Sequence, residues 1–380
     1  MACVVLCFAE AGSRVALTGG PYAYVEAVFG RYVGFLSGVL LWVLGTTAMA
    51  GVASAMSEQI EALFGVQGIR MPIIVSAFLL LTIVNIRGVK QGTRLIVGLS
   101  IAKLLPLIAF VAIGAFFLQP ANLAIHDVPP ASNMARAAIV LVFAFTGVES
   151  ALVPSGEVKD PARTVPRAIA IAMISITLLY LAVHLIAEGM LGDQLAVSTA
   201  APLAFAAEAF LGTPGRLLLL VGAAISMFGY VSGMTLAMPR ALYRFAEDGL
   251  LPRVVGAVHP GYRTPHVAII VQSTLVCLLA VFNSFEKMAV LSNLSALLLY
   301  AGCAVATILL RKRGIRQEGA LPFSVPGGPI IPIITVGLIV WLLTSITSGE
   351  WTVLVGTLIV ATIFYFIAGR TIRSGMEETA

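Results

Sequence analysis

The segment from Phe143 to Ser150, FAFTGVES, places a carboxylate, a glycine and two small hydroxyl groups within an apolar run. That run, from Ala137 to Val153, is close to the length of a membrane span. Charged side chains and unpaired backbone groups are both costly in hydrocarbon. We therefore predict a broken helix that faces a solute site. The alternative is an ordinary kinked span in which a neighbouring helix satisfies Glu149.

An unwound segment would supply chemistry suited to an ionic solute. Carbonyl groups at the end of one half-helix and N–H groups at the start of the next carry partial charges that attract ions. Carbonyl oxygens near Phe143 and Thr146 could accept hydrogen bonds from an ammonium group. Phe143 or Phe145 could close over the solute as a gate.

Lys103 is the second candidate, because it places an amine in the apolar run SIAKLLP. A lysine near the end of a span can extend its ammonium group to the membrane surface. A lysine that faces the protein interior instead is a candidate proton carrier. Both interpretations remain open for Lys103.

Other polar or small residues could line the same site, although close packing or helix capping explains them as well. They form three groups: Leu44, Gly45, Thr46 and Met49; Ser226, Gly229, Tyr230, Ser232, Gly233, Met234 and Thr235; and Ser292, Asn293 and Ser295. The four histidines do not cluster, and the four cysteines lack the spacing of a metal site. We expect neither an enzyme nor a cofactor, metal or nucleic-acid partner.

The composition indicates which elements must position these residues. Of 380 residues, 59% are hydrophobic and 11% are charged, and the mean hydropathy is +1.01. Soluble proteins carry about 25% charged residues. We predict an all-α polytopic membrane protein with spans at Val33–Ile60, Pro72–Val89, Leu95–Leu118, Met134–Pro154, Val165–Glu188, Leu217–Phe245, Pro265–Phe282, Met288–Leu310, Ile330–Ser348 and Thr352–Gly369.

The distribution of charge predicts the orientation. Most of the 23 Lys and Arg residues fall in alternate loops, whereas many acidic residues fall in the loops between them. Basic loops face the cytoplasm, so we predict a cytoplasmic C-terminus. The apolar run from Met1 to Phe8 is too short to span the bilayer and resembles the inner end of a span. We expect about 11 of an original 12 membrane segments, with the first preceding Met1.

Three motifs resemble amino acid permeases of the amino acid–polyamine–organocation superfamily. The first runs from Phe143 to Glu149 (FxFxGxE) and continues through the loop Gly156–Ala168. The second is the glycine- and tyrosine-rich stretch from Gly19 to Phe35. The third is Pro239–Pro252, followed by Thr264-Pro265. The similarity extends over nearly the whole chain.

The resemblance implies a fold of two inverted five-helix repeats with two further helices. It assigns the rest of the first repeat, helices 2–5, to residues 1–118, and the second repeat, helices 6–10, to 132–311. Two C-terminal helices at 329–370 and a cytoplasmic tail at 371–380 follow. The implied function is secondary active transport of amino acids or related amines across the cytoplasmic membrane. Alternating access, with proton symport or exchange, is the implied mechanism.

The resemblance also assigns roles to residues. Phe143 resembles the aromatic gate, and Lys103 resembles a fifth-helix lysine that replaces a sodium ion. Apolar third-helix positions disfavour a strongly cationic solute, Met234 stands where relatives often carry tryptophan, and the glycine-rich carboxylate site would precede Met1. The predicted solute-binding residues are Phe143, Ala144, Thr146, Gly147, Glu149, Gly45, Met49, Met234 and Ser295; those predicted for proton or ion coupling are Lys103, Glu149 and Ser232.

Two rival interpretations come from other classes. One is a truncated, permease-like membrane protein that does not transport. The other is a channel, which would need a continuous polar pore lining rather than isolated polar positions. Protons and the lipid bilayer are the expected partners besides the solute.

Overall fold

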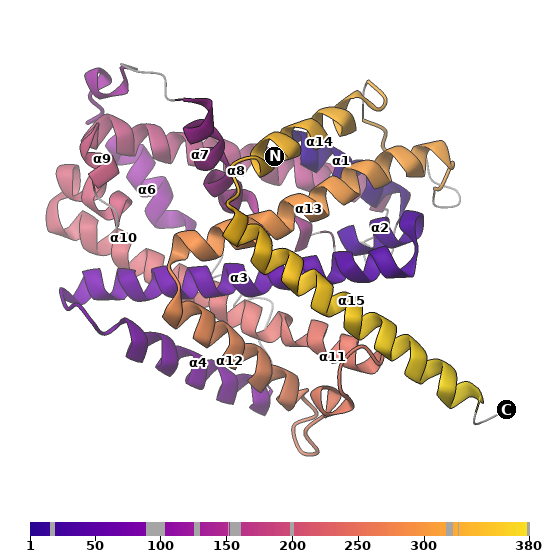
Figure 1. The fold of residues 1–380 in the computed structure, drawn as a ribbon. Helices are drawn as coiled ribbons and strands as arrows, with labels where there is room; N and C mark the ends of the chain where they lie inside the picture. Colours follow the sequence, from indigo (N-terminus) through magenta and orange to yellow (C-terminus); the bar gives the residue numbers. More distant parts are fainter. Residues whose placement is uncertain are drawn as a thin grey trace. The chain divides into compact units, whose positions relative to one another are not determined.

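The computed structural model describes residues 1–15, 20–88, 103–124, 130–150, 152, 161–197, 201–316, 322–325 and 327–377 (Figure 1). Helices dominate this part of the chain, and it contains no β-strand. The helices are α1 (Ala2–Arg14), α2 (Pro21–Phe29), α3 (Arg31–Phe64), α4 (Arg70–Arg87), α6 (Leu104–Gly114), α7 (Ala131–Val142), α8 (Pro161–Leu191), α9 (Gln194–Val197), α10 (Pro202–Ala237), α11 (Pro239–Glu247), α12 (His266–Phe282), α13 (Phe285–Lys312), α14 (Ile330–Leu343) and α15 (Ser348–Glu377), with short 3-10 turns η1 (Pro120–Leu123), η2 (Phe143–Phe145) and η4 (Arg253–Gly256).

The predicted helical membrane fold is confirmed. Seven helices in the described residues are long and apolar enough to cross a bilayer, and α6, α12 and α14 are shorter apolar helices. Every predicted span coincides with one of these elements, although three of the spans extend into segments outside the described residues. Large apolar side chains such as Leu79, Leu178 and Val340 remain exposed, as lipid-facing residues would.

Both boundaries of one predicted span differ from the structure. The span predicted to begin at Leu217 belongs to α10, which begins at Pro202 and contains a break at Gly212 with φ 64° and ψ −159°. Only glycine adopts that backbone conformation readily, so the helical path can bend there and continue. The same predicted span was expected to reach Phe245, but α10 ends at Ala237 and α11 begins at Pro239, which has no backbone N–H to donate.

The chain folds into two compact units that interleave along the sequence. Unit 1 comprises Met1–Thr47, Pro129–Ser175 and Ala289–Ala380, and unit 2 comprises Ala48–Val128 and Ile176–Met288. Each unit takes part of both predicted repeats. The compact units therefore do not correspond to the repeats predicted at residues 1–118 and 132–311, and the repeats stay a prediction.

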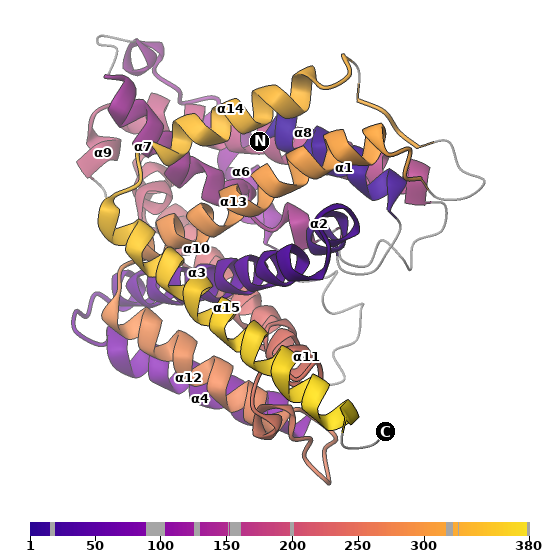
Figure 2. The same ribbon diagram turned by 45° about the vertical axis from the view of Figure 1, so that its right-hand side comes forward.

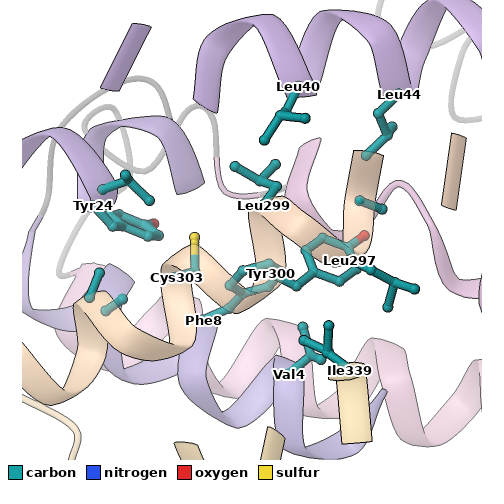
Figure 3. Close-up of a cluster of buried hydrophobic side chains, with 14 of the residues drawn as sticks. Val4, Phe8, Tyr24, Leu40, Leu44, Leu297, Leu299, Tyr300, Cys303 and Ile339 are labelled. Carbon is teal, nitrogen blue, oxygen red and sulfur yellow. The ribbon is translucent and has the colours of Figure 1, made fainter. Parts of the chain in front are cut away.

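In unit 1, helix α13 is surrounded by other elements. Two thirds of the most apolar 18-residue stretch of α13 is buried, against 6% of the corresponding stretch of α15. Tyr300 of α13 is fully buried and packs edge-on against Phe8 of α1, with ring centroids 5.2 Å apart (Figure 3). Helix α1 also packs along α14.

A cluster of charges joins the ends of α1 and α13. The Glu10 carboxylate is fully buried, and both of its oxygens accept hydrogen bonds from Arg311. Arg14 Nε donates to Glu10 Oε1 at 3.0 Å, and the Val325 N–H donates to Oε2 at 2.8 Å. This Glu10 cluster connects α1, α13 and the segment that precedes α14.

In unit 2, helices α4 and α12 lie side by side (Figure 2). Arg70, at the start of α4, holds the end of α12: its Nη2 donates to the carbonyl oxygens of Ala280, at 2.8 Å, and of Asn283. A cation at the C-terminal end of a helix satisfies carbonyls that lack partners within the helix. The same Nη2 donates to Ser54 Oγ at 2.8 Å, which ties α3 to the pair.

Candidate functional site

The helix that carries Glu149 breaks where the sequence predicts. Helix α7 ends at Val142, and the 3-10 turn η2 follows. Thr146 is then extended, with φ −63° and ψ 141°, and Gly147 has φ 110°. A residue with a Cβ rarely adopts a φ of 110°, so Gly147 permits the turn.

The broken segment is held in part by its own hydrogen bonds. The Phe143 carbonyl accepts from the Thr146 N–H at 3.2 Å and from the Thr146 hydroxyl at 2.6 Å. The Ser150 N–H donates to the Gly147 carbonyl at 3.0 Å. Both lone pairs of the Phe143 oxygen are thus in use, and an ammonium group at that oxygen would replace the Thr146 hydroxyl.

The Glu149 carboxyl group points into the protein, whereas Gly147 and Ser150 are exposed. It is fully buried: its Oε1 accepts from the Gly147 N–H at 2.8 Å and its Oε2 from the Tyr300 hydroxyl at 2.7 Å. No Lys, Arg or His of the described residues lies within ion-pair distance of it. Glu149 therefore accepts from two neutral donors, and the Tyr300 hydroxyl links the broken segment to α13.

Helix α13 also contacts the last turn of α7, before the break. Asn293 Nδ2 donates to the Ile139 carbonyl of α7 at 2.5 Å. The Phe143 N–H is bonded to the carbonyls of Val140 and Leu141, which leaves the Ile139 carbonyl without its usual helical donor. Ser292 extends to α3, where its hydroxyl donates to the Leu44 carbonyl at 3.0 Å.

Helix capping, the alternative to a solute-lining role for Ser292–Ser295, is contradicted. Helix α13 begins at Phe285, so this run lies about two turns inside the helix. The Ser295 hydroxyl is fully buried and donates to the Leu291 carbonyl of its own helix at 3.1 Å. Ser292 and Asn293 instead make contacts with neighbouring helices, and in sequence alone such residues resemble an N-terminal cap.

The remaining predicted site residues are divided between the two units. Gly45 is buried on the unit 1 part of α3, whereas Met49 on the unit 2 part accepts a hydrogen bond at its sulfur from Thr235 of α10 at 3.8 Å. Ser232 and Met234 are half-buried on α10. Lys103 precedes α6 and is exposed. Their roles in binding and coupling stay predictions.

Sequence reasoning missed Tyr300 and the contact of Asn293 with α7. Tyr300 is 151 residues from Glu149 in the chain, and no local pattern relates the two. The only signal was that Asn293 and Tyr300 are polar groups in an apolar span, which must find a partner.

Gly147→Ala is expected to destabilise the protein by about 1–3 kcal/mol, because a non-glycine residue would be strained at φ 110°. A methyl group there would meet nothing within 4 Å, so the effect isolates the backbone. The measurement is the thermal unfolding midpoint of the purified protein. Gly337→Ala in α14, where a methyl group also meets nothing within 4 Å, is the matched control and should not lower the midpoint. Equal midpoints for the two variants would contradict the assigned strain.

Helices long and apolar enough to cross a bilayer, with a break beside a buried carboxyl group, define a multi-pass membrane protein. The family comparison agrees: the model of the amino acid permease family matches residues 1–376, and the chain belongs to that family. The first part of the Gly156–Ala168 motif lies outside the described residues, as does Gly19.

Characterised relatives from Bacillus subtilis (strain 168) are similar over almost the whole chain. The methylthioribose transporter is 27% identical, covering 97% of this chain and 84% of the relative. The serine/threonine exchanger SteT is 29% identical, covering 98% and 85%. The branched-chain amino acid permease BcaP is 24% identical, covering 97% and 84%.

Proposed function

We propose that the protein is a secondary transporter that carries amino acids across the cytoplasmic membrane, by proton symport or by exchange. Membership of the amino acid permease family supports a transporter rather than an enzyme. The names of two relatives, an exchanger of serine and threonine and a permease for branched-chain amino acids, support an amino acid as the solute. The charge pattern of the loops supports a cytoplasmic C-terminus.

The observation that carries the proposal is the helix break itself. Helix α7 directs the negative end of its dipole at the break, which favours the ammonium group of a zwitterion. Phe143, Thr146 and Gly147 would surround that group, with Thr146 yielding its contact to the Phe143 carbonyl when the solute binds. Phe143 is half-buried, so its ring remains able to act as a gate.

Glu149 is the proposed coupling group of unit 1, and Lys103 that of unit 2. The Glu149 carboxyl is held by two neutral donors, so its protonation state can change without breaking an ion pair. A change there would alter the hydrogen bond to the Gly147 N–H, which lies in the broken segment. Solute binding and protonation would therefore act on the same few residues.

Uptake by the purified protein in proteoliposomes tests the solute. A panel of labelled amino acids, with methylthioribose added because one relative transports it, should give saturable uptake of at least one neutral amino acid. Proton symport predicts uptake that an inward proton gradient stimulates and a protonophore abolishes. Exchange predicts uptake only into vesicles loaded with solute. No uptake of any amino acid under either condition would contradict the proposal.

Glu149→Gln and Lys103→Ala test the coupling roles. Glutamine preserves the size of the side chain, and its amide can pair with both the Gly147 N–H and the Tyr300 oxygen. We expect at least one variant to retain uptake while losing its dependence on external pH between 5 and 8. Arg244→Ala, at an exposed ion pair with Glu247, is the control and should keep the pH profile. Unchanged pH profiles in both test variants would exclude the proton roles.

A further inference from the structure

The helix break in α7 is held from both sides by a single face of α13. Asn293 contacts the Ile139 carbonyl before the break, and Tyr300 contacts Glu149 after it. Tyr300 comes seven residues after Asn293, so the two side chains differ in direction by about 20° around the helix and lie roughly 10 Å apart along its axis. The two side chains therefore leave the same face of one continuous helix.

Burying the polar side chain of Asn293 costs free energy that an apolar side chain of the same size would not cost. Its side chain is fully buried, and its Oδ1 has no hydrogen-bond partner in the part of the chain that the structure describes. A leucine of similar size would remove this unsatisfied acceptor. The benefit of asparagine lies in its Nδ2, which donates to the Ile139 carbonyl that the end of α7 leaves without its usual helical partner.

We propose that Asn293 is a positioning residue for solute binding: with Tyr300 it holds the last turn of α7 and the segment after the break in fixed register. This inference rests on the proposed function, because the carbonyls at the end of α7 are the groups assigned to the solute's ammonium. Asn293 acts through the Ile139 carbonyl rather than by touching the solute.

Removing the donor releases the last turn of α7 from α13, while the link from Tyr300 to Glu149 remains. The end of α7 then samples other positions, so the solute binds less tightly. Transport steps after binding depend less on this contact. The expected signature is a rise in KM of roughly two- to tenfold, the range for loss of one hydrogen bond, with a smaller change in kcat.

The test uses Asn293→Ala and Asn293→Leu in the full chain, in lipid nanodiscs and proteoliposomes. Leucine fills the volume that alanine leaves empty, so it tests the donor even if the alanine variant does not fold. The matched control is Asn122→Ala, because Asn122 Nδ2 donates to the Gly189 carbonyl of α8 at 3.0 Å and so makes the same kind of contact in unit 2. Both Asn293 variants should raise KM, and the control should not.

Hydrogen–deuterium exchange of the peptide covering residues 139–150 provides a second readout that does not depend on transport. Both Asn293 variants should exchange faster there than the wild type, and Asn122→Ala should not. If both Asn293 variants exchanged faster than the wild type but the wild type transported no amino acid, the result would support the positioning role and contradict the proposed function. Wild-type exchange and KM in Asn293→Leu would overturn the inference, since volume alone would then explain the residue.

Discussion

Arg311→Ala is expected to destabilise the protein by about 3 kcal/mol, the lower end of the range for removing one partner of a buried ion pair, because Arg14 stays paired with Glu10. The Glu10 carboxylate has no solvent exposure, and Arg311 donates to both of its oxygens. Arg14 would keep its ion pair with Glu10 through one hydrogen bond to Oε1, and the Val325 N–H would keep its hydrogen bond to Oε2. These bonds do not replace the two-pronged contact of a guanidinium group. The measurement is the thermal unfolding midpoint in detergent, with monodisperse yield as a second readout.

Two further variants test why Arg311→Ala lowers the stability of the protein. Arg244→Ala removes an ion pair whose side chains are 76% and 40% exposed, so it should change stability by about 1 kcal/mol or less. The double variant Glu10→Leu with Arg311→Leu removes the buried carboxylate together with its two-pronged partner and should recover part of the lost stability, because Arg14, the second ion-pair partner of Glu10, keeps its hydrogen bond to Ser324 Oγ. A midpoint of Arg311→Ala equal to that of Arg244→Ala would contradict a structural role for the Glu10 cluster.

The sequence predicts the break in α7 because the signal is local. Gly147 and Glu149 stand two residues apart in an apolar run, and both are unfavourable in an uninterrupted membrane helix. Hydrophobic runs of about 20 residues likewise predict the helices. These features depend only on neighbours in the chain, so a single sequence suffices to find them.

The partners of the break are not predictable in the same way. Asn293 and Tyr300 are more than 150 residues from their contacts, and only the folded arrangement of α7 and α13 brings them together. Arg311 stands in the basic run RKR at 311–313, which in sequence indicates a cytoplasmic loop, yet its guanidinium group pairs with the buried Glu10 carboxylate. A charge count treats every arginine alike, whereas burial distinguishes a topological signal from a structural ion pair.

Glu149→Ala is expected to abolish uptake and to destabilise the protein by about 2–5 kcal/mol. The substitution leaves the fully buried Tyr300 hydroxyl without its acceptor, which costs about 1–3 kcal/mol, and it removes the hydrogen bond from the exposed Gly147 N–H. It also opens a void beside Tyr300. The broken segment would then lose its connection to α13 on the side after the break.

A graded series separates this structural role from proton transfer. Tyr300→Phe removes one of the two hydrogen bonds and should cause a partial loss of stability and uptake, whereas Glu149→Gln keeps both and should keep the fold. Thermal midpoints and uptake rates should therefore fall in the order wild type, Glu149→Gln, Tyr300→Phe and Glu149→Ala. If Glu149→Ala were as stable as Glu149→Gln, the buried carboxyl would not hold the break, and its role would be limited to the proton.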